Sequence, residues 1–159
     1  YLARYLKNEV GELNRHNVRL DAIAQIYRLP EFVQEQLKKT KAALSRNNGL
    51  TLVLALSYGG RTEIVDATRA IADKVRQGQL DVAEINPQIF SQHLYTKGFP
   101  DPDLLIRTSG EMRVSNFLLW QISYAELVVT KTLWPDFRKA QFFDALEEYA
   151  RRHRRFGTV

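Results

Sequence analysis

Polar and charged side chains gather in one short stretch, DLLIRTSGEMRVSNFLLWQISYAE, at residues 103–126. Its polar part carries Arg107, Arg113 and Ser115. Arginine presents a rigid fork of donors that suits phosphate oxygens, so two arginines and a hydroxyl in one loop predict a polyphosphate site. We expect a helix to begin at Ser115, where free N–H groups and the helix dipole would add to anion binding.

A carboxylate, Glu126, follows the expected helix. A carboxylate beside a polyphosphate would repel it unless a divalent cation lay between them, so Glu126 is a candidate magnesium ligand. The alternative is a strand-edge carboxylate with no ligand role. Glu111 lies between the two arginines, and we expect it to pair with one of them or to fix the loop. The loop as a whole has an alternative too: a solvated surface in which Ser115 merely caps its helix.

The elements that must position this loop alternate between helices and strands. Apolar residues recur every three to four positions in the expected helices, and the strand segments are rich in branched apolar residues. This alternation predicts an α/β fold with a mainly parallel central sheet flanked by helices. Ligands in such folds bind beyond the carboxyl ends of the strands, where this loop begins. The expected helices are 2–13, 31–46, 62–77, 86–94, 115–124 and 139–155, and the expected strands are 18–26, 50–58, 104–108 and 126–132.

Length and charge set limits on the function. A chain of 159 residues predicts one domain, residues 1–159. The net charge of +5 favours anionic partners, but no recognition helix or aromatic stacking platform supports nucleic acid. The chain has no cysteine, which is compatible with a cytoplasmic location. Its longest apolar run, residues 50–56, is too short to span a bilayer, so we expect at most transient contact with a membrane surface.

Two further features have structural explanations. The segment 58–61, Tyr-Gly-Gly-Arg, resembles a phosphate-binding turn but lacks the spacing of a dinucleotide fingerprint or a P-loop. We expect its glycines to permit a tight backbone turn, with Arg61 as a weaker anion-binding candidate. The basic run at 151–155 would complement the dipole of the last helix.

Longer motifs resemble a known family. Residues 58–75 (YGGRTEIVDATRAIADKV), 106–127 (IRTSGEMRVSNFLLWQISYAEL) and 133–137 (LWPDF) resemble the cis-prenyltransferases. RHNVRL at 15–20 and RRFG at 154–157 add to the likeness, which is closest to the bacterial undecaprenyl diphosphate synthases, also called isoprenyl transferases. The aspartate-rich helical motifs of trans-type prenyl synthases are absent from the sequence.

The resemblance implies a magnesium-dependent enzyme. Such an enzyme condenses isopentenyl diphosphate onto an allylic diphosphate, such as farnesyl diphosphate, with cis geometry. The implied product is a long-chain polyprenyl diphosphate, undecaprenyl diphosphate for the cell-wall lipid carrier. The resemblance also implies a homodimer with contacts from residues 126–137, and a role for Glu126 in holding magnesium. The residues that it assigns to the diphosphate of isopentenyl diphosphate are Arg107, Arg113, Val114 and Ser115.

One part of the family pattern is missing. The family begins with a Met-Asp-Gly-Asn motif that holds magnesium and cradles the allylic diphosphate, whereas this sequence opens on Tyr1 inside a helical pattern without a cap. We therefore expect the C-terminal portion of a cis-prenyltransferase domain, carrying the isopentenyl diphosphate half-site, and assign no catalytic residue to it. The alternative is a non-catalytic partner subunit or binding module of the same fold.

Overall fold

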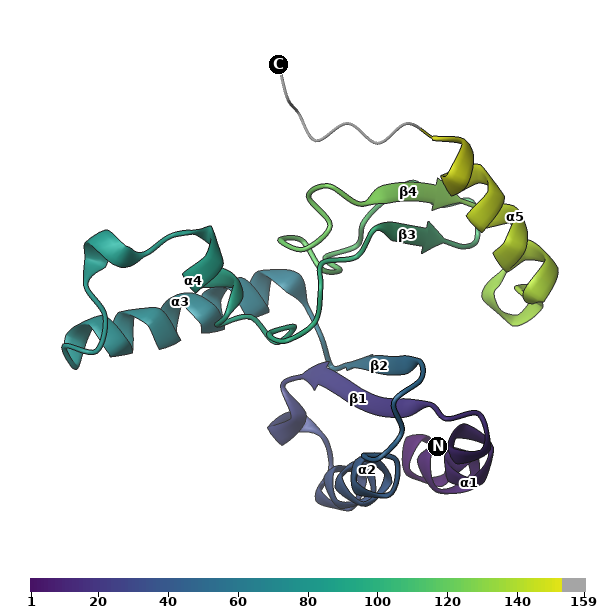
Figure 1. The fold of residues 1–159 in the computed structure, drawn as a ribbon, viewed down its shortest axis with the longest axis horizontal. Coiled ribbons are helices and arrows are strands. Elements are labelled where there is room, and N and C mark those ends of the chain that lie inside the picture. Colours follow the sequence, from purple (N-terminus) through teal and green to yellow (C-terminus); the bar gives the residue numbers. More distant parts are fainter. Residues whose placement is uncertain (153–159) are drawn as a thin grey trace. The chain divides into compact units, whose positions relative to one another are not determined.

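The computed structural model describes residues 1–152 and divides the chain into two compact units, residues 1–58 and 59–159. Each unit contains a two-stranded parallel sheet and several helices (Figure 1). The α/β class and the parallel pairing predicted from the sequence are therefore confirmed.

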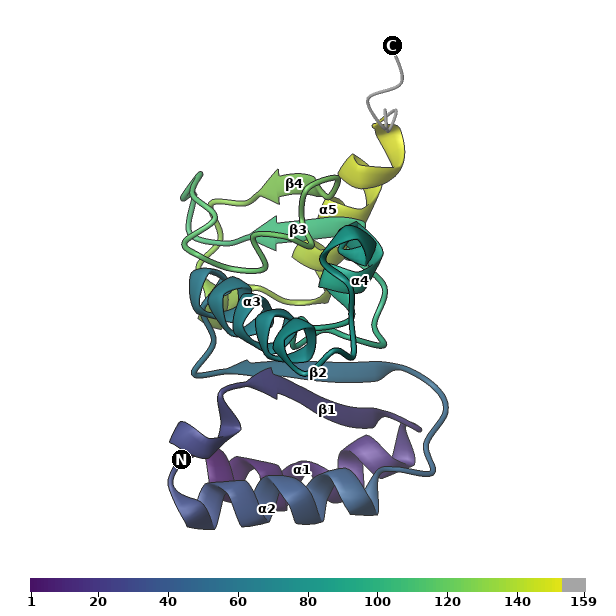
Figure 2. The same cartoon turned by 90° about the vertical axis from the view of Figure 1, so that its left-hand side faces the viewer.

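The first unit packs two helices on one side of its strands (Figures 1 and 2). The strands pair in parallel along their whole length, with Arg19 opposite Thr51. Four buried leucines form the core between helices and strands: Leu6, Leu20, Leu37 and Leu44. The elements are α1 (Leu2–Arg15), β1 (Arg19–Ala24), a 3₁₀ helix (Ile26–Arg28), α2 (Glu31–Ala43) and β2 (Thr51–Leu56).

The second unit holds the predicted polyphosphate loop. Its two strands pair in parallel with Leu104 opposite Glu126 and Arg107 opposite Val129. The last helix packs on the second strand, and Val128 and Ala145 are buried there. The elements are α3 (Gly60–Arg76), a 3₁₀ helix (Val82–Glu84), α4 (Pro87–Ser91), β3 (Leu104–Arg107), β4 (Glu126–Val129), a 3₁₀ helix (Trp134–Asp136) and α5 (Lys139–Arg151).

Residues 115–124 form a series of turns, so the prediction of a helix there is wrong. Ser115, Asn116 and Leu118 have φ angles of 52°, 62° and 46°, in the left-handed region that a right-handed helix cannot contain. Apolar spacing alone does not determine the backbone conformation, because apolar side chains can occur in turns as well as in helices. The helix N-terminus expected to help bind an anion at Ser115 is therefore absent.

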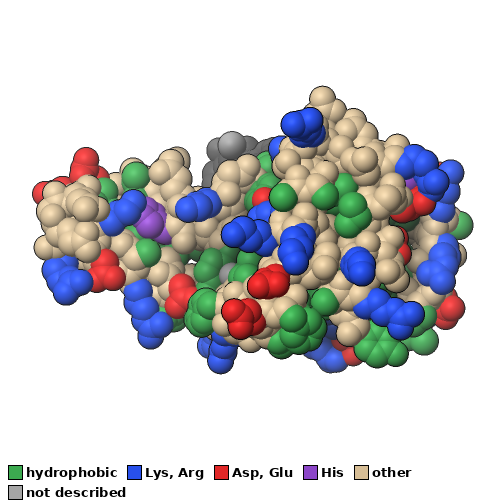
Figure 3. Space-filling model, turned by 90° about the horizontal axis from the view of Figure 1, so that it is seen from below, with side chains coloured by type: hydrophobic (Ala, Val, Ile, Leu, Met, Phe, Trp, Pro, Cys, Tyr) green, Lys and Arg blue, Asp and Glu red, His purple; other side chains and the backbone are tan. Residues whose placement is uncertain are grey.

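Four expected helices end earlier than predicted, among them α3 at Arg76 and α4 at Ser91. The helix α2 stops at Ala43, and α5 stops at Arg151 because Arg152 is extended, with φ −83° and ψ 140°. The rest of the basic run, residues 153–155, lies outside the described residues. Among residues 1–152, no helix has the length and apolar character needed to cross a membrane. On the face shown in Figure 3, Lys and Arg side chains are dispersed among acidic and apolar ones.

Candidate diphosphate site

The loop after β3 is attached to the end of β4 by backbone hydrogen bonds. Thr130 N–H donates to Arg107 O at 2.8 Å, Ser109 N–H to Thr132 O at 2.9 Å and Gly110 N–H to Thr130 O at 2.8 Å. The loop therefore begins at the carboxyl ends of both strands, which is where α/β folds bind ligands.

Four of the predicted site residues line one hollow of about 340 Å³. This volume lies at the lower end of the roughly 300–1,000 Å³ typical of ligand pockets. Apolar side chains of β3 and of the turn segment (residues 115–124) supply the rest of its wall. The hollow therefore has a charged part and an apolar part. The lining residues are Leu105, Ile106, Arg107, Arg113, Val114, Ser115 and Phe117.

Glu111 holds the two arginines of the hollow together. One guanidinium N–H of Arg107 and one of Arg113 donate to different oxygens of the Glu111 carboxylate. The hydrogen bond from Arg107 is the main cause that lowers the pKa of Glu111, and the charge of Arg113 adds to it. The predicted pairing of Glu111 is confirmed, and it involves both arginines. Together the three groups carry one net positive charge.

Arg107 also has an unused donor. Its Nε atom is buried and has no hydrogen-bond partner among the described residues. Leaving a buried donor unpaired costs about 1–3 kcal/mol, so the contacts with Glu111 do not satisfy this side chain completely. The hollow itself offers the positive groups of Arg107 and Arg113, which suit an anion.

Glu126 lies at the other end of the strand pair from Arg107. Arg107 faces Val129, three residues after Glu126, and three residues of a parallel strand span about 10 Å. The Glu126 carboxylate accepts a hydrogen bond from Arg152 Nη1 at 3.0 Å. This bond is the main cause that raises the pKa of Arg152. The structure thus does not bring Glu126 into the hollow.

The carboxylates and histidines do not form a complete metal site. Within residues 1–152, no group of three or more such side chains could hold a metal ion. Glu126 offers the oxygen ligands that Mg²⁺ prefers, but it is a single carboxylate and is already paired with Arg152. The described residues alone therefore do not fit a magnesium site.

Asn116, which the sequence analysis did not identify, ties the turn segment to α3. Its main-chain oxygen accepts from Gly60 N–H at 2.7 Å, and its side-chain Oδ1 accepts from Arg61 N–H at 2.8 Å. A Cβ atom on Gly60 would lie 2.9 Å from Leu119 Cγ, so glycine is needed here for the close approach of two chain segments. The N–H groups of Gly60 and Arg61 are therefore occupied by Asn116, and the phosphate-turn interpretation of residues 58–61 is not needed.

A buried polar pair makes a second connection to α3. Glu63 and Gln121 are 1% and 2% exposed, and Gln121 Nε2 donates to both Glu63 oxygens at 3.2 and 3.1 Å. Glu63 also accepts from Tyr95 N–H at 2.8 Å. The sequence did contain a signal for this pair, because Gln121 is the only amide in the otherwise apolar run FLLWQI at 117–122.

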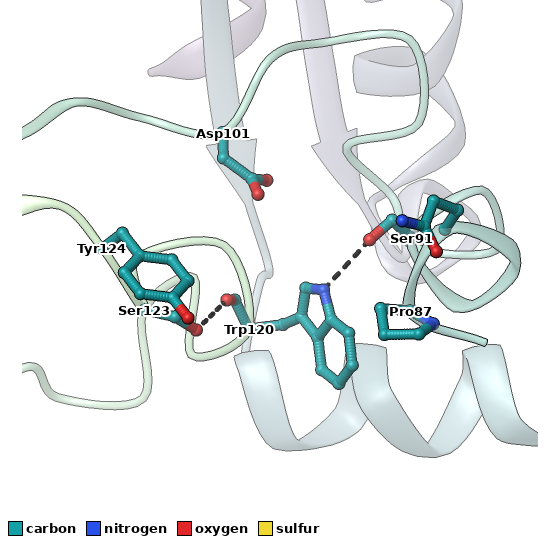
Figure 4. A pocket seen from close by; sticks show the side chains of 7 residues that line it. Pro87, Ser91, Asp101, Trp120, Ser123 and Tyr124 are labelled. Atoms are coloured by element: carbon teal, nitrogen blue, oxygen red, sulfur yellow. Dashed lines mark hydrogen bonds between the residues drawn. The ribbon is translucent and has the colours of Figure 1, made fainter. Parts of the chain in front are cut away.

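A second hollow, of about 450 Å³, lies beside Trp120 (Figure 4). The Trp120 indole N–H donates to Ser91 Oγ at 3.0 Å, and Asp101 contributes a carboxylate. Its lining residues are Pro87, Gln88, Ser91, Asp101, Trp120, Ser123 and Tyr124, which include no cation. A diphosphate needs positive charge, so charge decides against this larger hollow and in favour of the one that Arg107 and Arg113 line.

Comparison with known proteins gives a consistent result. A sequence model of the family described as "Putative undecaprenyl diphosphate synthase" matches residues 1–157. An isoprenyl transferase of Porphyromonas gingivalis is 52% identical over 97% of this chain and 61% of its own length. The ditrans,polycis-undecaprenyl-diphosphate synthase ((2E,6E)-farnesyl-diphosphate specific) of Escherichia coli K12 is 48% identical over 96% of this chain and 60% of its own length.

A solved structure is also similar. The crystal structure of lavandulyl diphosphate synthase from Lavandula x intermedia, in complex with dimethylallyl diphosphate, has a TM-score of 0.95 and 42% sequence identity. The similarity covers 99% of this chain and 68% of that one. The chain spans 61% and 60% of the two curated relatives described above, which is less than two thirds of their length.

Proposed function

This chain belongs to the undecaprenyl diphosphate synthase family, and we propose that it carries the isopentenyl diphosphate half-site of a cis-prenyl chain-elongating transferase. The proposed reaction condenses isopentenyl diphosphate onto an allylic diphosphate such as farnesyl diphosphate, and the proposed product is undecaprenyl diphosphate. The activity is proposed for the intact protein, because the chain spans only about 60% of its E. coli relative. We place the protein in the cytoplasm.

The observation that carries the proposal is the hollow in which Arg107, Arg113 and Ser115 meet. Two guanidinium groups bind diphosphate oxygens by charge-assisted hydrogen bonds, and Ser115 offers a hydroxyl. The apolar wall of Leu105 and Ile106 suits the short hydrocarbon part of isopentenyl diphosphate. These residues bind and orient the acceptor, and they make or break no bond themselves.

The reaction defines what this positioning achieves. The double bond of the acceptor attacks the first carbon of the allylic substrate, the allylic diphosphate leaves, and a proton is then lost from the acceptor. A diphosphate anchored at a fixed point holds the double bond at a fixed distance from that anchor. Effective orientation of two reactants can supply several kcal/mol of a barrier.

Magnesium belongs to the proposal for the intact protein, with Glu126 as the proposed ligand of this chain. Mg²⁺ is commonly held by one or two carboxylates together with substrate phosphates. To bind the cation, Glu126 would have to give up its ion pair with Arg152.

We also propose a homodimer that uses residues 126–137. The 3₁₀ helix at Trp134–Asp136 and the start of α5 expose large apolar side chains, and Trp134 stacks on Phe137 with ring centroids 6.1 Å apart. Exposed large apolar side chains that lie close together in one segment are candidates for a protein–protein contact. The exposed side chains are Leu133 (57%), Trp134 (72%), Phe142 (43%) and Phe143 (50%).

Arg113→Ala in the intact protein tests the proposed function. Losing a hydrogen-bonded charged group costs about 2–3 kcal/mol, so the Michaelis constant for isopentenyl diphosphate should rise about 30- to 140-fold. Arg76→Ala is the matched control, because Arg76 pairs with Asp73 on the exposed surface of α3, away from the hollow. An unchanged Michaelis constant for Arg113→Ala would show that the diphosphate binds elsewhere.

Two further measurements distinguish the alternatives. Activity of the homodimer without a second subunit would exclude a non-catalytic partner subunit. A steep salt-dependent affinity for RNA or DNA would favour a nucleic-acid binder.

A further inference from the structure

Asn116 supplies the cap that α3 lacks. The first four N–H groups of a helix have no partner inside the helix. Gly59 occupies the N-cap position of α3 and has no side chain with which to accept a hydrogen bond. Asn116 satisfies two of these groups, with its main-chain oxygen on Gly60 N–H and its Oδ1 on Arg61 N–H.

The same residue lies between two residues that line the diphosphate hollow. Ser115 precedes it and Phe117 follows it, and both line the hollow. The other end of the loop is attached to β4 through Ser109 and Gly110. The segment that carries Arg113 is therefore held at both ends, at β4 and at the start of α3.

The conformation of Asn116 restricts what can replace it. Its φ angle of 62° lies in the left-handed region, which Asn, Asp and Gly tolerate better than other residues. Of these three, Asn and Asp also provide a side-chain oxygen for Arg61 N–H. Glycine keeps the backbone shape but loses this hydrogen bond.

We propose that Asn116 is a positioning residue for diphosphate binding. By capping α3 it holds Arg113–Phe117 in the shape that binds the ligand, without needing to touch the ligand itself. This inference rests on the proposed function of the hollow. Asn116 acts together with the buried Glu63–Gln121 pair, which fixes the same turn segment one helical turn further along α3.

The test compares Asn116→Gly with Asn116→Asp in the intact protein. For Asn116→Gly, the Michaelis constant for isopentenyl diphosphate should rise about fivefold, the equivalent of about 1 kcal/mol, which is typical of one lost hydrogen bond. The turnover number at saturating substrate should change less than twofold. Asn116→Asp keeps the acceptor oxygen and should return the Michaelis constant to within about twofold of the wild-type value.

Asn86→Gly is the matched control. Asn86 caps α4 in the same unit by accepting from Ile89 N–H at 2.9 Å, and α4 contributes no residue to the hollow. This variant loses the same kind of hydrogen bond and should leave the Michaelis constant unchanged. An equal rise for Asn86→Gly and Asn116→Gly would overturn the inference, because it would reflect general destabilisation.

The two proposals can fail separately. If Arg113→Ala weakens binding while Asn116→Gly does not, the hollow binds the diphosphate and the positioning role of Asn116 is wrong. If Arg113→Ala has no effect, the proposed function itself is wrong. A rise for Asn116→Gly that Asn116→Asp does not reverse would also overturn the inference, since the capping oxygen would then not be the cause.

Discussion

Replacing Gly60 by alanine should destabilise the second unit. The added Cβ atom would lie 2.9 Å from Leu119 Cγ, 3.1 Å from Leu119 N and 3.2 Å from Asn116 O. Two of these three atoms belong to the backbone, which cannot move aside as the end of a side chain can. The turn segment must therefore shift away from α3, and the hydrogen bond from Gly60 N–H to Asn116 O, now 2.7 Å, must lengthen.

The size of the effect follows from packing. Forcing an extra carbon into a closely packed contact costs about 1–3 kcal/mol, and a weakened hydrogen bond adds up to about 1 kcal/mol. The better helix propensity of alanine offsets less than about 1 kcal/mol of this. We expect a net loss of about 1–3 kcal/mol in the free energy of unfolding of the second unit.

Gly11→Ala provides the opposite result in the same fold. Gly11 is exposed in the middle of α1, and a Cβ atom there would have no neighbour within 4 Å. Alanine should therefore stabilise the first unit by about 0.5–1 kcal/mol, because glycine costs a helix that much. The two variants make the same chemical change and should have effects of opposite sign.

Urea unfolding followed by two signals can separate the units. The chain has two tryptophans, Trp120 and Trp134, and both belong to the second unit, so fluorescence reports on that unit alone. Gly60→Ala should lower the fluorescence midpoint, whereas Gly11→Ala should raise the midpoint seen by circular dichroism. A Gly60→Ala protein as stable as the wild type would refute the close approach of the turn segment to α3.

Three further perturbations have predictable outcomes. Because the pKa of Glu111 is lowered, its ionised carboxylate contributes to stability above the ordinary carboxyl pKa, and this contribution is lost as the pH falls through the lowered pKa. Glu111→Gln should therefore make the melting temperature depend less steeply on pH in the acid range. Gln121→Leu should reduce the free energy of unfolding by about 1–3 kcal/mol, measured in urea, because the buried Glu63 carboxylate loses two hydrogen bonds. Trp134→Glu should convert the proposed dimer into monomers in sedimentation velocity at micromolar concentration, whereas Arg76→Ala should not.

Much of the fold could be predicted because local patterns of apolar residues indicate its helices and strands. The apolar periodicity of 31–46 and 62–77 predicted the helices that form α2 and α3, and the apolar residues at 104–108 and 126–132 predicted β3 and β4, which do pair in parallel. The loop after the first of these strands was predicted to bring Arg107, Arg113 and Ser115 together, and these residues do line one hollow.

The remaining features depend on contacts between distant residues. The left-handed φ of Leu118 has no local sequence signal, because leucine is not a residue that favours it. The shape of the turn is set by hydrogen bonds that Asn116 accepts from the N–H groups of Gly60 and Arg61, which lie more than 50 positions earlier in the chain. The ion-pair partner of Glu126 is Arg152, 26 residues later in the chain. Neither this ion pair nor the turns that replace the predicted helix at 115–124 can be recognised in a window of ten or fifteen residues.

Glu111 explains how a site for an anion can exist before the anion binds. Two guanidinium groups in one short loop repel each other, and a carboxylate between them removes that repulsion while leaving one positive charge. A diphosphate that enters the hollow then competes with Glu111 for the same N–H groups, so its affinity is the difference between two sets of charge-assisted bonds. The Nε atom of Arg107, which Glu111 leaves unpaired, is not part of that competition.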